Sequence, residues 1–153
     1  MLNVIASLLT GKNDRSRPGS GDPDRKIKIA ACVILLEMAN ADDDFSPPER
    51  EKLRALLQND LGLGDDEVGA VLSIAEGEHR DAVDLWAYTN LINSNFSIER
   101  KRRLVEMIWE LAYTDGRIGE QEDYLAHKLA NLLHVSHRDM IAAKLKVTGG
   151  GAG

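Results

Sequence analysis

Four carboxylates recur at matching positions in two stretches of the chain. Residues 42–49 and residues 115–122 each begin with an aspartate and end with a glutamate, giving Asp42 with Glu49 and Asp115 with Glu122. Oxygen ligands of this kind suit hard divalent cations such as Mg²⁺ or Ca²⁺. The pattern therefore predicts a divalent-metal site of the Ca or Mg class. It is not an EF-hand, whose loop needs about twelve residues between its first and last ligands.

Turn chemistry is a second interpretation of the same acids. Ser46 and Glu49 have the spacing of a capping box at the start of a helix. Glu122 also lies in a first helical turn, where an acid complements the helix dipole. Asp42 and Asp115 could accept hydrogen bonds from amides of their turns. Capping and cation binding both remain open at this point.

The acids must be positioned by the helices on either side of each turn. Asp42 lies four residues after Met38, and Asp115 lies four residues after Leu111. Residues three, four or seven apart share a helix face, so each acid continues an apolar stripe. We expect all four carboxylates to point toward the seams between helices. There they would need a proton, hydrogen bonds or a cation.

Helical periodicity runs through the chain, and no stretch keeps the two-residue alternation of a strand. We expect helices at about 25–41 with Asp24 as cap, 47–60, from 65, 81–94, 98–114, 119–133 and after Ser136. Residues 27–74 and 98–146 follow the same order of elements. The predicted fold is all-α, a single domain of about seven helices built from two pseudo-symmetric helix–turn–helix repeats.

Composition divides the chain into three parts. We expect an N-terminal amphipathic segment and a flexible Gly/Ser/Pro linker at residues 1–24, the helical domain at 25–147 and a disordered tail at 148–153. No apolar run approaches the roughly 18 residues of a membrane span, so no integral span is expected. Residues 1–9 lack the basic start of a signal peptide. They are expected to dock on the domain itself, with peripheral membrane contact as the alternative.

Charge argues against nucleic acid as a partner. The chain carries 25 acidic and 19 basic residues, a formal net charge of −6. The one basic run, residues 100–103, is expected to be a solvated helix face. Cys32 lies in an apolar stretch and is expected to be a buried, unreactive thiol. Trp86 and Trp109 are expected to be core aromatics.

Catalytic motifs are weak throughout the sequence. There is no nucleophile–base pair, glycine-rich phosphate loop or Ser/His/Asp arrangement of useful specificity, so we do not expect an enzyme. A small two-metal hydrolase is the least favoured hypothesis. His127 follows Asp123 by four residues, a candidate transition-metal pair, and His134 and His137 are close in sequence. For these histidines, packing or surface roles are favoured.

The paired turns resemble those of the tellurite-resistance protein B (TerB)-like family. Its hallmark is an apolar helix that ends in Ala-x-x-Asp-Gly and is followed by a helix that begins near a glutamate, in two copies. Residues 112–116, Ile118 and Glu122 fit this pattern well. In the first copy Asp43 stands where the pattern has glycine. The likeness covers about residues 25–147 and is closest to a branch of short bacterial proteins, related to the N-terminal domain of some membrane-anchored J-domain co-chaperones.

The resemblance implies an all-helical pseudo-symmetric domain in the bacterial cytoplasm, with an acidic site for a divalent metal. It also implies a loose link to tellurite or envelope stress, and no enzymatic activity. Two functions follow as hypotheses. The first is a non-enzymatic stress-response or regulatory module that binds metal through the four acids. The alternative is a metal-free protein–protein interaction module with an unknown protein partner.

Overall fold

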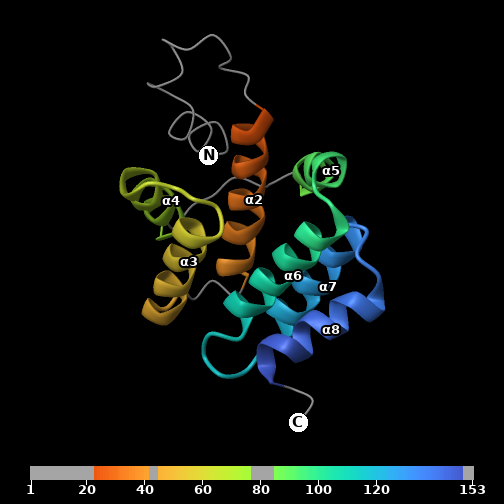
Figure 1. Cartoon of the computed structure of the whole chain (residues 1–153). Coiled ribbons are helices and arrows are strands. Elements are labelled where there is room, and N and C mark those ends of the chain that lie inside the picture. Colours follow the sequence, from red (N-terminus) through yellow and green to blue (C-terminus); the bar gives the residue numbers. More distant parts are fainter. Residues whose placement is uncertain (1–22, 42–44, 77–84, 150–153) are drawn as a thin grey trace.

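The fold is all-α, as expected. The computed structural model describes residues 23–41, 45–76 and 85–149, and these residues form helices without any strand. Figure 1 shows their arrangement. The helices are α2 (Pro23–Ala39), α3 (Pro47–Asn59), α4 (Asp65–Glu76), α5 (Leu85–Asn95), α6 (Ile98–Ala112), α7 (Glu120–Leu132) and α8 (His137–Thr148). The expectations for residues 1–22, for Asp42 and for the last four residues lie outside the described residues.

Helix α2 is the centre of the molecule. Residues 29–36 are all buried, so α2 is apolar around its whole circumference along this stretch. It packs against α3 and α4 on one side and α5, α6 and α7 on the other (Figure 1). The helix begins at Pro23, so Asp24 lies inside its first turn and the predicted cap at Asp24 was wrong. A central helix of this kind positions the helices that pack against it.

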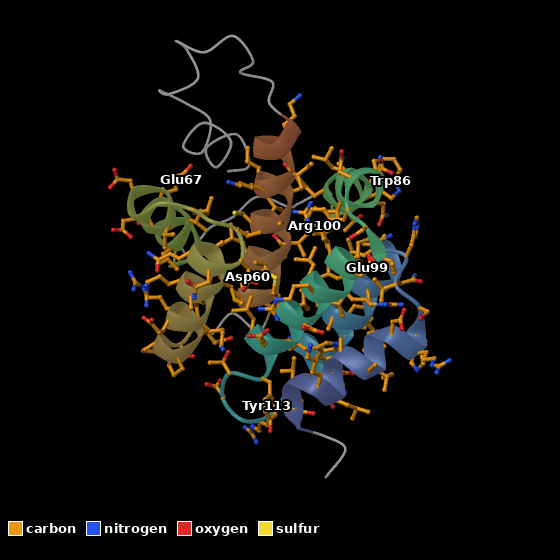
Figure 2. All side chains as sticks on the ribbon, in the orientation of Figure 1. Asp60, Glu67, Trp86, Glu99, Arg100 and Tyr113 are labelled. Atoms are coloured by element: carbon orange, nitrogen blue, oxygen red, sulfur yellow. The ribbon has the colours of Figure 1, made fainter. Side chains whose placement is uncertain are left out.

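The C-terminal helices pack around a buried tryptophan. Trp109 on α6 is fully buried, and α6 packs along α8 and against α7. Trp86, by contrast, is 64% exposed, so its predicted place in the core was wrong. Figure 2 shows Trp86 at the outer edge of α5. Position 86 lies in the first turn of α5, one turn before the buried Thr89, so the exposed ring stands at the end of the helix where it can extend past the core.

Serine caps set the starts of three helices. The hydroxyl oxygens of Ser46, Ser97 and Ser136 each accept a hydrogen bond from the backbone N–H three residues later, at 3.3, 3.2 and 3.1 Å. A serine cap of this kind typically stabilises a helix by about 1 kcal/mol. The sequence predicted each of these helix starts because the serines precede apolar periodic segments.

Candidate functional site

The turn between α2 and α3 ends in a reciprocal capping box. Glu49 is only 2% exposed, and its Oε1 atom accepts hydrogen bonds from the Ser46 backbone N–H at 3.0 Å and the Ser46 hydroxyl at 3.1 Å. The Glu49 N–H donates back to Ser46 Oγ. Pro47 starts the helix, where its missing N–H is harmless. The buried position of Glu49 is therefore satisfied by the cap.

The turn between α6 and α7 repeats half of this arrangement. Glu122 is 6% exposed, and its Oε1 accepts a hydrogen bond from the Gly119 backbone N–H at 2.9 Å. Gly119 is the N-cap and has no side chain to donate or to accept the return bond. Glu122 thus holds the same position relative to its helix as Glu49. Its carboxylate accepts fewer hydrogen bonds from the N-cap residue than that of Glu49 does.

The two aspartates behave differently from the glutamates. Asp115 is exposed, so the prediction that it points into a helix seam was wrong. The helix has ended at Ala112, and Gly116 turns the chain with φ +87° while donating its N–H to Tyr113 O at 2.9 Å. Helical periodicity no longer directs a side chain beyond that point. Asp42 lies outside the described residues, so its side chain cannot be placed relative to Asp115.

A cavity lies between the end of α2 and the start of α7. It has a volume of about 440 Å³. Its lining residues are Glu37, Asn40, Ala41, Glu120, Gln121, Tyr124 and Leu125. Ala41, the residue before Asp42, therefore lies beside the first turn of α7, close in sequence to Glu122. The cavity therefore places Ala41, the residue before the first acidic motif, beside residues 120 and 121 of the second motif.

The oxygen donors of this cavity extend the predicted set of ligands. Glu37 and Glu120 carry carboxylates, and Asn40 and Gln121 carry amide oxygens, all of which suit a hard cation. The sequence analysis did not name them as candidate ligands. Glu37 stands at the same place before its turn as Glu110 does before the second turn, and this match was the available signal. Within the described parts of the chain, no three His, Cys, Asp or Glu side chains are already grouped as a metal site.

A second polar cavity is lined by side chains that form a network of ion pairs. The Arg103 guanidinium donates to both carboxylate oxygens of Asp60, at 3.0 and 2.9 Å, and lies 2.7 Å from Glu110. Hydrogen bonding to Asp60 is the main cause that raises the pKa of Arg103. Lys52 and Lys146 line the same cavity of about 420 Å³, beside Glu110 and Glu106 respectively. Positive and negative groups here neutralise one another.

The basic run at residues 100–103 is used inside the fold. Arg100 lies over the Phe96 ring at 4.1 Å, Lys101 bonds Asn93 at 3.3 Å, and Arg102 pairs with Asp139 at 3.0 Å. Each cation of the run therefore has an intramolecular partner. Their partial exposure agrees with the predicted helix face and gives no support to a phosphate-binding role.

Cys32 is buried as expected. Desolvation is the main cause that raises the pKa of its thiol to about 12. A thiol in this state is a poor nucleophile at neutral pH because the thiolate is the reactive form. Over the residues that the structure describes, no helix has the length and apolar character needed to cross a membrane.

Comparison with known proteins gives one match. The family model described as tellurite resistance protein TerB matches residues 28–145. The matched region runs from α2 to α8 and includes both acidic turns. Searches of curated proteins and of solved structures returned no match.

Proposed function

The chain belongs to the tellurite resistance protein TerB family, and on that premise we propose that it is a non-enzymatic, cation-regulated module of a tellurite or envelope-stress response. The observation that carries the cation part is the repeated construction of the two turns. In both, a buried glutamate closes the helix that follows an Asp-containing turn. Carboxylates at matching positions, each beside an Asp-containing turn, supply the oxygen ligands that a hard divalent cation prefers.

The proposed ligands are Asp42, Glu49, Asp115 and Glu122, with Glu37 and Glu120 as further donors from the cavity. A carboxylate has two oxygens and about four lone-pair directions, so accepting a cap bond leaves capacity for a cation. The all-oxygen donor set fits an ion of the Ca or Mg class. Bound at the end of α2 and the start of α7, such an ion would hold the two acidic turns together.

A thermal melt tests this proposal. Purified, chelator-treated protein is melted with Mg²⁺, Ca²⁺ or Mn²⁺, beside the Asp42→Ala/Asp115→Ala variant. A ligand that binds only the folded state at about 100 times its dissociation constant adds roughly 2.7 kcal/mol. For a chain of this size that raises Tm by about 5–10 °C. We expect a saturable rise in the wild type and none in the variant.

The control variant is Asp66→Ala, which removes an exposed acid from the first turn of α4, away from both acidic turns. It should keep the full metal response. If Mg²⁺, Ca²⁺ and Mn²⁺ leave the wild-type Tm unchanged at millimolar concentration, the cation proposal fails. The acids are then caps and turn residues only.

The metal-free interaction module remains the second candidate. Tyr124 favours it, because this aromatic is 70% exposed and lines two of the cavities on α7. Exposed tyrosines are common anchors of protein interfaces. Under this function, Tyr124→Ala would weaken binding to a partner while Asp42→Ala/Asp115→Ala would not. The two candidates thus predict opposite outcomes for the same pair of variants.

A further inference from the structure

Two imidazoles from neighbouring helices share a cavity between α7 and α8. The cavity has a volume of about 460 Å³ and contains His127 from α7 and His137 from the first turn of α8. Met140 is buried and lines it as well. None of the residues that line this cavity is acidic. Its lining therefore offers imidazole nitrogens and a thioether sulfur beside the neutral oxygens of Tyr124 and Asn131, whereas the cavity beside α2 carries carboxylates.

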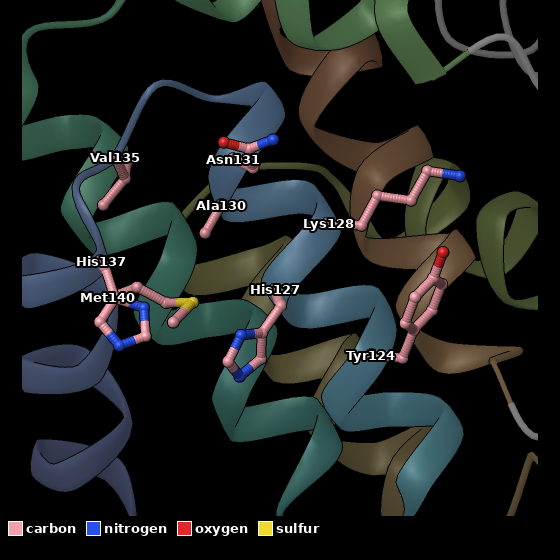
Figure 3. A pocket seen from close by; sticks show the side chains of 8 residues that line it. All are labelled: Tyr124, His127, Lys128, Ala130, Asn131, Val135, His137 and Met140. Carbon is pink, nitrogen blue, oxygen red and sulfur yellow. The ribbon is translucent and has the colours of Figure 1, made fainter.

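The spacing of the two rings matches that of two ligands on one ion. Their centroids are 6.2 Å apart, with an interplanar angle of 50°. Imidazole nitrogens bind Zn²⁺ at about 2.0–2.1 Å, which places the centres of two coordinated rings roughly 5 Å apart at a tetrahedral angle and about 6.3 Å apart at a linear one. Figure 3 shows both rings on the same side of α7, whereas Lys128 extends away from them. The observed separation lies within this range, so a small rotation of the side chains would bring one nitrogen of each ring to a common ion.

An acidic side chain lies behind one of the rings. Asp123 Oδ2 lies 3.6 Å from His127 Nε2, and Lys144 donates to the other Asp123 oxygen at 3.1 Å. Metal-binding histidines commonly have such a carboxylate behind them. Trp109 packs against the same ring in an edge-to-face contact at 6.0 Å.

We propose that His127 and His137 bind a late transition-metal ion of the Co²⁺, Ni²⁺, Cu²⁺ or Zn²⁺ class, which bridges α7 and α8. Imidazole suits these ions, and the buried thioether of Met140 adds a soft neighbour. Two protein ligands leave the remaining positions to water, so the site is open and exchangeable. It is separate in residues and in ligand chemistry from the proposed oxygen site at the acidic turns.

Calorimetric titration of the full chain without an affinity tag tests the site. Ni²⁺ and Zn²⁺ are titrated into the wild type, His127→Ala and His137→Ala, each checked for folding by circular dichroism. We expect one equivalent of metal in the wild type. Either substitution should weaken binding at least about tenfold, since even second-shell partners of histidine ligands matter by roughly 10–100-fold.

The matched control is His134→Asn, which removes an imidazole that does not line the cavity. His134 has φ +58°, a conformation that asparagine also tolerates. The affinity of His134→Asn for the metal should equal that of the wild type. The Asp42→Ala/Asp115→Ala variant should also keep the wild-type affinity. Equal affinity in His127→Ala and His137→Ala, or no saturable binding by the wild type, overturns the proposal.

A second measurement needs no variant. Zn²⁺ is added to the ¹⁵N-labelled wild type, and the imidazole nitrogen resonances are followed by NMR. We expect the resonances of His127 and His137 to shift together, with saturation at one equivalent. Shifts confined to the other histidines would overturn the assignment. Because the acidic turns contain no histidine, this result is independent of the cation proposal above.

Discussion

At the scale of single residues, Glu49 should contribute more to stability than an ordinary first-turn acid. Replacing it with alanine leaves the half-buried Ser46 N–H and hydroxyl without their shared acceptor. We expect Glu49→Ala to lower the free energy of unfolding by about 1–2 kcal/mol in chelator-containing buffer. Urea denaturation measures this.

Glu99→Ala is the comparison for that measurement. Glu99 is exposed in the first turn of α6, and the cap there is made by Ser97 alone. A surface change of this kind typically stays within about 0.5 kcal/mol. If Glu49→Ala costs no more than Glu99→Ala, the buried glutamate is not held by its cap, and its burial would require another cause.

Cys32 gives the prediction for pH dependence. In the folded protein burial raises the pKa of the thiol to about 12, from an ordinary value of 9.0. Between these values the unfolded chain loses its proton and the folded chain keeps it, so stability falls as pH rises above about 9. At neutral pH this loss of stability is absent, because the thiol keeps its proton in both states. Its slope approaches about 1.4 kcal/mol per pH unit.

Urea denaturation of the wild type and Cys32→Ala at pH 8, 9 and 10 isolates this contribution, because lysines and tyrosines titrate equally in both proteins. The wild type should lose stability faster above pH 9. Parallel pH profiles would contradict the raised pKa. The native thiol should also resist Ellman's reagent until the protein unfolds.

At the scale of elements, Arg103 connects α6 to the end of α3. Its fork binds both oxygens of Asp60, a geometry that lysine cannot reproduce. The Arg103 side chain is 42% exposed, so solvent screens the pair. We expect Arg103→Lys to cost about 0.5–1 kcal/mol at low salt and less in 1 M NaCl.

The matched control is Arg54→Lys. Arg54 bonds Glu51 and Gln58, both within α3, so it connects no two elements. Arg54→Lys should lower the free energy of unfolding by too little to measure. An Arg103→Lys loss that is equal at low and high salt would show that packing of the arginine stem, and not the ion pair, holds the two helices.

At the scale of the whole molecule, the structure predicts one cooperative unit, because α2 packs against helices on both of its sides. Ile34 is fully buried in α2, so Ile34→Ala should cost about 2–5 kcal/mol. With Trp86→Phe as background, fluorescence of Trp109 reports on α6 and circular dichroism reports on all helices. Both midpoints should move together. Two separate transitions would mean that the two sides of α2 unfold independently.

The sequence predicted the helices well because apolar periodicity marks them and serine caps begin three of them, α3, α6 and α8. It predicted the burial of Glu49 and Glu122 for the same reason, since both lie within regular helices. It was wrong for Asp115, which lies after the helix end, where Gly116 sets the direction of the chain. It also missed the cavity between α2 and α7, because no local pattern encodes which helix ends meet.

The central place of α2 has a consequence during synthesis on the ribosome. α2 is the first described helix to emerge, yet α5, α6 and α7, which cover one of its sides, are translated after α3 and α4. The cover on that side of α2 is complete only when residue 132 has left the exit tunnel. Exposed surface of this kind recruits chaperones and promotes aggregation. Translational arrest between α4 and α7 should therefore produce nascent chains that bind chaperones, whereas completed chains are released.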